Sequence, residues 1–305
     1  METLSEQLTE LYESKWNGLM EQLEANGLRD KLQCPFLISL LRSGQKKEER
    51  EKEQALIGYD KWYAQKGTSE HEEWYTKADI KIMFFGKEPN GWERDNAEEH
   101  LDVGDLMATY EDFLDDNYVA IEGNGGYFRG GSQFFKRGIN GMMAEIKDNL
   151  LSAYPGKRVS MIWNEISKLS ARTAKGGGAV SVEAHGIEKN FFHVIPDEVE
   201  ILKPDILIFF IGPGMENNKY YNYILENFKL NGKPNPLPNL PTGEDVIKLP
   251  IEGVKFAYKT YHPGYAPKEA NTFHWKLYDA ILKDIKENID QLLEKEYPMN
   301  HFGIT

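Results

Sequence analysis

The segment Ile80–Trp92 restricts the possible folds of this chain more than any other part of the sequence. It begins with an apolar run, interrupted only by Lys81, and passes directly into Gly-Lys-Glu-Pro. A continuous apolar run is typical of a strand that is buried on both faces. Gly86 permits a sharp exit from such a strand, and Pro89 stiffens the turn that follows. We therefore expect Glu88 to be held on a rigid turn at the rim of a sheet.

Short apolar segments alternate with segments of helical character along the chain. Strands are predicted at Ile80–Gly86, Val159–Trp163, Ile206–Gly212 and Val254–Tyr261. Helices are predicted at Phe135–Leu151, Phe191–Leu202, Asn217–Phe228 and Glu269–Lys295. Strands that alternate with helices favour a parallel sheet with helices on both faces. The prediction is an α/β fold, a three-layer α/β/α sandwich with a central four-stranded parallel sheet.

Two regions are expected to extend this α/β domain, which we place at 76–305. Residues 1–75 carry an amphipathic stripe of leucines before Gly27, and a second, highly charged helix is predicted from Lys46 to Tyr63. We interpret them as an N-terminal helical extension. Residues 91–131 form an acidic insertion, because Glu93–Glu122 contains eleven acidic residues and one basic residue. We expect a solvated surface subdomain or a segment that narrows access to a site.

Polar residues follow the carboxyl ends of the predicted strands. Glu88 follows the first strand, Asn164 the second and His262 the fourth, while the third strand runs into Gly-Pro-Gly. Open α/β sheets place their functional sites at the carboxyl ends of the strands. The sequence therefore predicts that Glu88, Asn164 and His262 converge on one crevice.

The composition limits the class of protein. The chain has 305 residues, a net charge of −13 and one cysteine, Cys34, which excludes an internal disulfide and any multi-cysteine metal cluster. No apolar run reaches the about 20 residues of a membrane helix, and the acidic N-terminus is not a signal peptide. We expect a cytoplasmic protein without a membrane partner, a metal or another cofactor. Outside Glu93–Glu122 the net charge is only −3, so a face that binds nucleic acid remains compatible with the sequence.

Three motifs, in this order and on these strands, resemble the uracil-DNA glycosylase superfamily. In that superfamily a first strand ends in Gly-x-Asp-Pro or Gly-x-Asn-Pro, a second in Asn and the last in His-Pro-Ser-Pro. The corresponding segments here are Gly86-Lys87-Glu88-Pro89, Trp163-Asn164-Glu165 and His262-Pro263-Gly264-Tyr265. The resemblance covers about 78–292, and its motif style is nearest to the single-strand-selective and mismatch-specific branches. This chain departs from the pattern with Glu88 at the acidic position and Gly264 in place of Ser.

The residue types suit cleavage of an N-glycosidic bond, which develops positive charge on the sugar and negative charge on the base. The Glu88 carboxylate can activate water and offset the cation, and His262 can donate a hydrogen bond to the base. The Asn164 amide carries a donor and an acceptor, as needed to read a Watson–Crick edge. The resemblance implies the same roles for Glu88 and His262.

Other residues receive roles around the flipped base and the DNA. Phe134 is our choice among the aromatic residues downstream of the first motif for the ring on which the base stacks. We place Gly86 and Lys87 beside the base. We expect DNA contacts from Pro263, Gly264 and Tyr265, with the Tyr265 ring wedged into the base stack.

The sequence thus predicts a monomeric, monofunctional DNA glycosylase that removes uracil or a modified pyrimidine by base flipping, with single-stranded or base-modified DNA among its substrates. Two alternatives stay open. The first is a catalytically inactive protein of the same fold that binds a nucleotide, a nucleic acid or a protein. The second is an unrelated α/β hydrolase or nucleotide-binding enzyme. Taken singly, Glu88 could cap a helix, Asn164 could serve in a turn, and His262 could simply end a strand.

Overall fold

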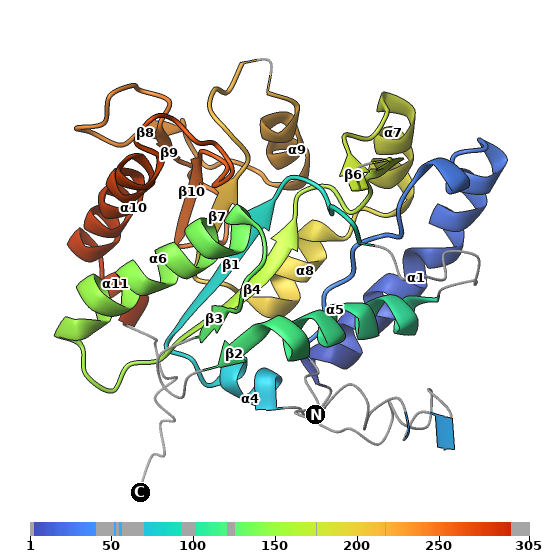
Figure 1. Ribbon diagram of the computed structural model, residues 1–305, viewed down its shortest axis with the longest axis horizontal. Helices are drawn as coiled ribbons and strands as arrows, with labels where there is room; N and C mark the ends of the chain where they lie inside the picture. The colour runs from blue at the N-terminus through green and yellow to red at the C-terminus, as the bar shows by residue number, and fades with distance from the viewer. Residues whose placement is uncertain are drawn as a thin grey trace, which may run out of the picture.

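Figure 1 shows the computed structural model of the chain, which describes residues 3–40, 52, 55–56, 70–92, 102–120, 126–174, 176–216 and 218–293. The helix predicted from Lys46 to Tyr63 lies outside the described residues, apart from isolated positions. A mostly parallel sheet forms the centre of the molecule, and helices flank it (Figure 1).

The central sheet has six strands in the order β4-β1-β7-β10-β9-β8. Four of them are parallel and correspond to the predicted strands: β1 (Ile80–Gly86), β4 (Val159–Glu165), β7 (Ile206–Phe210) and β10 (Phe256–Thr260). Two further strands, β9 (Val246–Lys248) and β8 (Asn235–Pro236), are antiparallel and extend the sheet beyond β10. The prediction of four strands is therefore wrong in number. Strands of three and two residues are too short to show a periodic pattern in the sequence.

The remaining elements surround this sheet. The helices are α1 (Leu4–Ala25), η1 (Arg29–Lys31), α4 (Glu70–Thr76), α5 (Val103–Asn117), η2 (Phe134–Ile139), α6 (Asn140–Glu145), η3 (Ile146–Leu150), η4 (Leu151–Ala153), α7 (Val182–Phe191), α8 (Ile195–Leu202), α9 (Lys219–Asn227), α10 (Ala270–Glu287) and α11 (Asp290–Leu293). Two small antiparallel hairpins are formed by β2 (Tyr118–Ala120) with β3 (Gly126–Phe128) and by β5 (Ala171–Thr173) with β6 (Gly176–Gly178).

Side chains alternate between the two faces of the sheet, as they must in any strand. On one face, Phe210 packs against Phe84, against Phe134 of η2 and against Tyr278 of α10; we call it the α10 face. On the other, which we call the α8 face, Phe85 packs against Phe209 and the α8 helix lies nearby. The alternation decides which face each polar residue at a strand end can reach.

Helix α1 packs directly on the α/β core. It begins at a capping box formed by Thr3 and Glu6, and its apolar stripe belongs to the same hydrophobic cluster as the sheet. The Tyr12 ring stacks on Phe192, and its hydroxyl donates a hydrogen bond to Glu198 of α8. The segment predicted as an N-terminal extension therefore contributes its first helix to the central core.

The described part of the predicted acidic insertion is also built into the core. The Tyr110 hydroxyl of α5 donates a hydrogen bond to the Trp163 carbonyl oxygen of β4 at 2.9 Å. Glu111 is buried and accepts a hydrogen bond from the Ser39 hydroxyl. The α5 helix thus covers the β4 edge of the sheet and is not a solvated subdomain. Residues 93–101 and 121–125, which carry the rest of the acidic run, lie outside the described residues.

A buried charge network joins β4 to α8 and α1. Lys168, which is 1% exposed, has its Nζ 2.7 Å from Glu198 Oε1 and donates to Asn164 Oδ1 at 2.5 Å. Glu198 also accepts hydrogen bonds from Asn164 Nδ2 at 2.8 Å and from the Tyr12 hydroxyl at 2.6 Å. Burial lowers the pKa of Lys168, and the Glu198 charge opposes that shift. The network satisfies charges that would be costly to bury alone.

We predict that Lys168→Met lowers the free energy of unfolding by about 3–5 kcal/mol, because the change leaves Glu198 buried without its counter-charge. Urea denaturation measures the difference. The matched control is Lys229→Met, which removes an ion pair with Glu252 whose lysine is 79% exposed. Exposed pairs contribute little to stability. Equal losses in the two variants would contradict the importance of the buried network.

Candidate functional site

The rim formed by the carboxyl ends of the four parallel strands holds most of the predicted site residues. Lys87 and Glu88 follow β1, Gly212 follows β7 and His262 follows β10. In the sheet β7 lies between β1 and β10. Neighbouring strands are about 4.8 Å apart, so the ends of β1 and β10 are about 10 Å apart. A nucleoside is large enough to bridge this gap.

The turn that carries Glu88 is held from two sides. The Tyr220 hydroxyl of α9 donates a hydrogen bond to Glu88 Oε2. On the other side, the glycine hairpin β5-β6 packs on the turn: the Gly177 amide donates to Asn90 Oδ1 at 2.8 Å. A Cβ atom on Gly176 would lie only 2.6 Å from Asn90 Oδ1, so glycine is needed for this close approach. The rigid placement expected for Glu88 is therefore supported by its contacts.

Lys87 follows β1 directly before Glu88, and its charge also acts on His262. Its side chain is half-buried, with Nζ 5.4 Å from the centre of the Tyr220 ring. Burial lowers the pKa of Lys87, the Glu88 charge acts in the opposite direction, and Lys219 lowers it further. A lysine in this position supplies positive charge to a ligand at the rim.

The geometry around His262 fixes the tautomer of its neutral ring. The Gly264 amide donates a hydrogen bond to Nδ1 at 3.0 Å, so the ring proton belongs on Nε2. Burial lowers the pKa of His262 to about 4, with smaller contributions from the charges of Lys87 and His274. At neutral pH His262 is therefore an uncharged imidazole with a donor at Nε2.

Phe134 packs beside His262. The two rings are stacked, with centroids 5.9 Å apart and an angle of 27° between their planes. Phe134 also contacts Trp163 of β4 and Phe210 of β7 on the α10 face. The structure thus brings the predicted stacking residue to the predicted donor, although Phe134 is itself buried.

The loop after His262 is clamped to two helices. Arg137 of η2 donates a hydrogen bond from Nη1 to the Pro263 carbonyl oxygen at 2.7 Å, and Pro263 itself is buried. The Tyr265 carbonyl oxygen lies 2.8 Å from His274 Nε2 of α10. Gly264 is exposed, and the Tyr265 side chain is 49% exposed. Of the three predicted DNA contacts, Gly264 and Tyr265 are therefore open to a partner.

Asn164 is not brought to this rim. It is fully buried on the α8 face, where Nδ2 donates to Glu198 and Oδ1 accepts from Lys168 Nζ and from the Glu165 amide. Of the three residues expected to converge, Glu88 and His262 therefore lie at the same rim and Asn164 does not. Its neighbours Trp163 and Glu165 point to the opposite face because side chains alternate along β4. We do not assign base reading to Asn164.

Glu165 is a rim residue that the sequence prediction missed. It ends β4 and pairs in register with Gly86. A Cβ atom on Gly86 would lie 2.7 Å from the carboxyl carbon of Glu165, so the carboxyl group occupies the space that glycine leaves. Trp163 donates a hydrogen bond from Nε1 to Glu165 Oε1 at 2.9 Å. The sequence did contain a signal for this position. Alternate residues of a strand face the same side, so Glu165 shares the face of Trp163.

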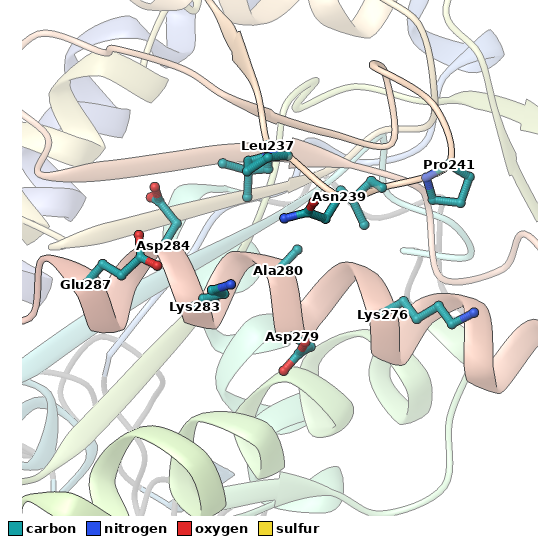
Figure 2. A pocket seen from close by; sticks show the side chains of 11 residues that line it. Leu237, Asn239, Pro241, Lys276, Asp279, Ala280, Lys283, Asp284 and Glu287 are labelled. Carbon is teal, nitrogen blue, oxygen red and sulfur yellow. The ribbon is translucent and has the colours of Figure 1, made fainter.

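A separate groove of about 690 Å³ lies between α10 and the loop 237–241 (Figure 2). Its walls alternate in charge, with Lys276 and Lys283 beside Asp279, Asp284 and Glu287. None of the predicted site residues lines it. The candidate site is therefore the rim and not this groove.

Three further findings bear on function. The described residues contain no group of three or more His, Cys, Asp or Glu side chains placed to hold a metal ion. None of the described helices combines the length and the apolar character needed to cross a membrane. A scan against protein-family models and a search of curated proteins both find no match for the chain.

We predict that Glu165 makes stability fall as the pH rises. Burial, and the nearby Glu88 charge, raise the pKa of Glu165 to about 8, against an ordinary value of 4.5. The folded state therefore binds more protons between these two values, and this stabilisation is lost as the pH rises through about 8. Its size is on the order of 4 kcal/mol between about pH 5 and pH 9.

Urea denaturation at several pH values measures this effect. Glu165→Gln should remove its share of the decline and leave the share due to Glu188, whose pKa burial raises to about 7. The exposed control Glu252→Gln should follow the wild-type curve. A Glu165→Gln curve parallel to that of the wild type would contradict the assignment.

Proposed function

We propose that the protein hydrolyses the N-glycosidic bond of uracil or of a modified pyrimidine in DNA. One observation carries the proposal: a carboxylate, Glu88, and a neutral imidazole donor, His262, lie at one rim on strands two places apart in the sheet. A hydrolase of this kind needs a carboxylate near the sugar and a hydrogen-bond donor near the departing base.

The reaction follows from these positions. The Glu88 carboxylate orients a water molecule and accepts its proton as the water oxygen bonds to C1′ of the deoxyribose. The bond from C1′ to the base nitrogen breaks, and its electron pair leaves with the base. His262 donates from Nε2 to the base oxygen that takes up this charge. The base leaves as an anion and takes a proton from solvent, Glu88 returns its proton to solvent, and the products are the free base and an abasic site. Tyr220 keeps Glu88 oriented through its hydroxyl.

The surroundings of the rim supply contacts suited to DNA. Lys87 and Lys219 each hold an ammonium group close to the Tyr220 ring, where backbone phosphates can be bound. The partly exposed His262 ring, which is backed by the buried Phe134 ring, offers aromatic surface for an extruded base. In this proposal the exposed Tyr265 ring, which packs on Tyr261, fills the gap left in the base stack.

A second candidate is a protein of this architecture that binds a nucleotide, a nucleic acid or a protein partner without cleaving it. The burial of Asn164 favours this alternative, because a residue expected to select the base is engaged elsewhere. The two candidates differ in whether Glu88→Gln has any turnover to lose.

We predict abasic-site formation by the wild type on an oligonucleotide with one uracil, hypoxanthine, 5-hydroxymethyluracil or modified cytosine, measured as strand cleavage after alkali treatment. Glu88→Gln should lose about 10²–10⁴-fold in rate, because the base that activates water is removed. His262→Ala should lose about 10²–10³-fold through loss of the donor.

The control for these variants is Glu252→Gln, an exposed carboxylate near the start of β10, which should keep the wild-type rate. Retained cleavage in Glu88→Gln would remove Glu88 from the mechanism. Tight DNA binding without cleavage of any of these bases would establish the binding alternative.

A further inference from the structure

Trp275 of α10 is a large aromatic side chain that its neighbours hold in place without covering it. Helices α6 and α10 lie side by side (Figure 1), and Gly141 of α6 packs on the ring, where a Cβ atom would lie 3.2 Å from Cη2 and Cζ3. The Tyr278 ring meets the indole edge-on, with centroids 5.9 Å apart. Trp275 is nevertheless 40% exposed. A ring fixed in this way loses little freedom when a flat ligand stacks on it.

Arg137 connects Trp275 to the rim. Its Nη1 donates a hydrogen bond to the Pro263 carbonyl oxygen at 2.7 Å, in the loop after His262, and its Nε donates to Asn271 Oδ1 at 3.2 Å. Asn271 and Trp275 are four residues apart, so they lie on the same face of α10. The indole is therefore about one helical turn from the loop at the His262 end of the rim.

The surface around Trp275 is basic although the chain as a whole is acidic. Residues 123–144, which include the helical turns packed against α10, form the longest stretch of the sequence without an acidic residue and contain three basic ones. Lys136 of this stretch and Lys276, next to Trp275, are both exposed. Within the described part of the chain neither lysine forms an ion pair. Asp279, one turn further from the rim, offsets part of this charge.

An exposed aromatic ring beside basic side chains without ion pairs is suited to a single strand of nucleic acid. Bases stack on the ring, and the backbone phosphates are attracted by the ammonium groups. A base inside a duplex is already stacked between its neighbours, so a ring on the protein surface cannot stack on it in the same way. The combination therefore favours an unpaired strand over a duplex.

We propose that Trp275, Lys136 and Lys276 bind a single strand of DNA beside the rim, with the indole stacked on an unpaired base. The inference rests on the proposed function, because it takes the strand to continue from a nucleotide whose base occupies the rim. It specifies the form of the substrate: the strand is unpaired on the side of the target base that faces α10.

The test uses a fluorescent strand of about 12 nucleotides, a length within the site sizes of such surfaces, with one central 2′-fluoro-2′-deoxyuridine. The fluorine withdraws electrons and slows loss of the base, so anisotropy reports binding without turnover. Trp275→Leu should weaken binding of the single strand about tenfold, as loss of one stacked base predicts, and should leave the affinity for the annealed duplex unchanged. Trp275→Phe keeps an aromatic ring and should retain most of the wild-type affinity.

The lysines are tested through the salt dependence of binding. Each phosphate contact contributes about 0.7 to the slope of log K against log salt concentration for a single strand, so Lys136→Gln and Lys276→Gln should each make the slope shallower by about this amount. Two matched controls should bind as the wild type: Lys286→Gln, an exposed lysine in the last turn of α10, and Phe191→Leu, an aromatic residue of α7 that is also 40% exposed. Thermal unfolding monitors the folding of every variant.

The outcomes separate this inference from the proposed function. Wild-type affinity of Trp275→Leu for the single strand overturns the inference, and so does an equal loss in Trp275→Leu and Trp275→Phe. An equal loss in Phe191→Leu also overturns it. In each case cleavage of a uracil-containing strand by the wild type leaves the glycosylase proposal standing. Binding that depends on Trp275, without cleavage of any of the modified bases, supports the inferred surface and overturns the glycosylase proposal.

Discussion

The buried Lys168 ammonium requires a counter-charge in its immediate surroundings, and this requirement organises the structure around β4. Glu198 supplies the charge from α8, Asn164 bonds to both partners, and the Tyr12 hydroxyl brings in α1. Since a buried charge without its partner costs several kcal/mol, these segments must come together for any of them to be stable. The N-terminal helix is thereby part of the architecture that holds the end of β4 in place.

At the end of β4, a shift of one residue along the strand decides which face of the sheet a side chain reaches. Asn164 and Glu165 are neighbours in sequence, yet one belongs to the charge network of the α8 face and the other to the rim. Gly86 makes this arrangement possible, because any side chain there would collide with the Glu165 carboxyl group. The glycine in the first motif therefore has a packing role in addition to the turn that its sequence position suggested.

The sequence predicted those features that depend on long, regular patterns. The bounds of β1 are those predicted, Ile80–Gly86, and the ends of the other three parallel strands lie within two residues of the expected positions. Their apolar runs are unambiguous. The structure of Val103–Asn117 could not be inferred in the same way, because its many acidic residues mask the stripe that buries Tyr110 and Glu111. The partners of Asn164, Glu165 and Lys168 were equally inaccessible, since they depend on α8 and β1, which are distant in sequence.

The net charge of the whole chain, −13, does not describe the charge at the rim, and the reason is physical. Burial disfavours the charged form of any group, and here it acts on the acid Glu165 and the base His262 alike, so both are neutral at pH 7. The formal charges of Glu88 and Glu165 would balance those of Lys87 and Lys219. With Glu165 protonated, this group of four side chains instead carries one carboxylate against two lysines. Under the proposed function, this charge would attract an anionic strand to the rim, and the attraction should weaken as Glu165 ionises.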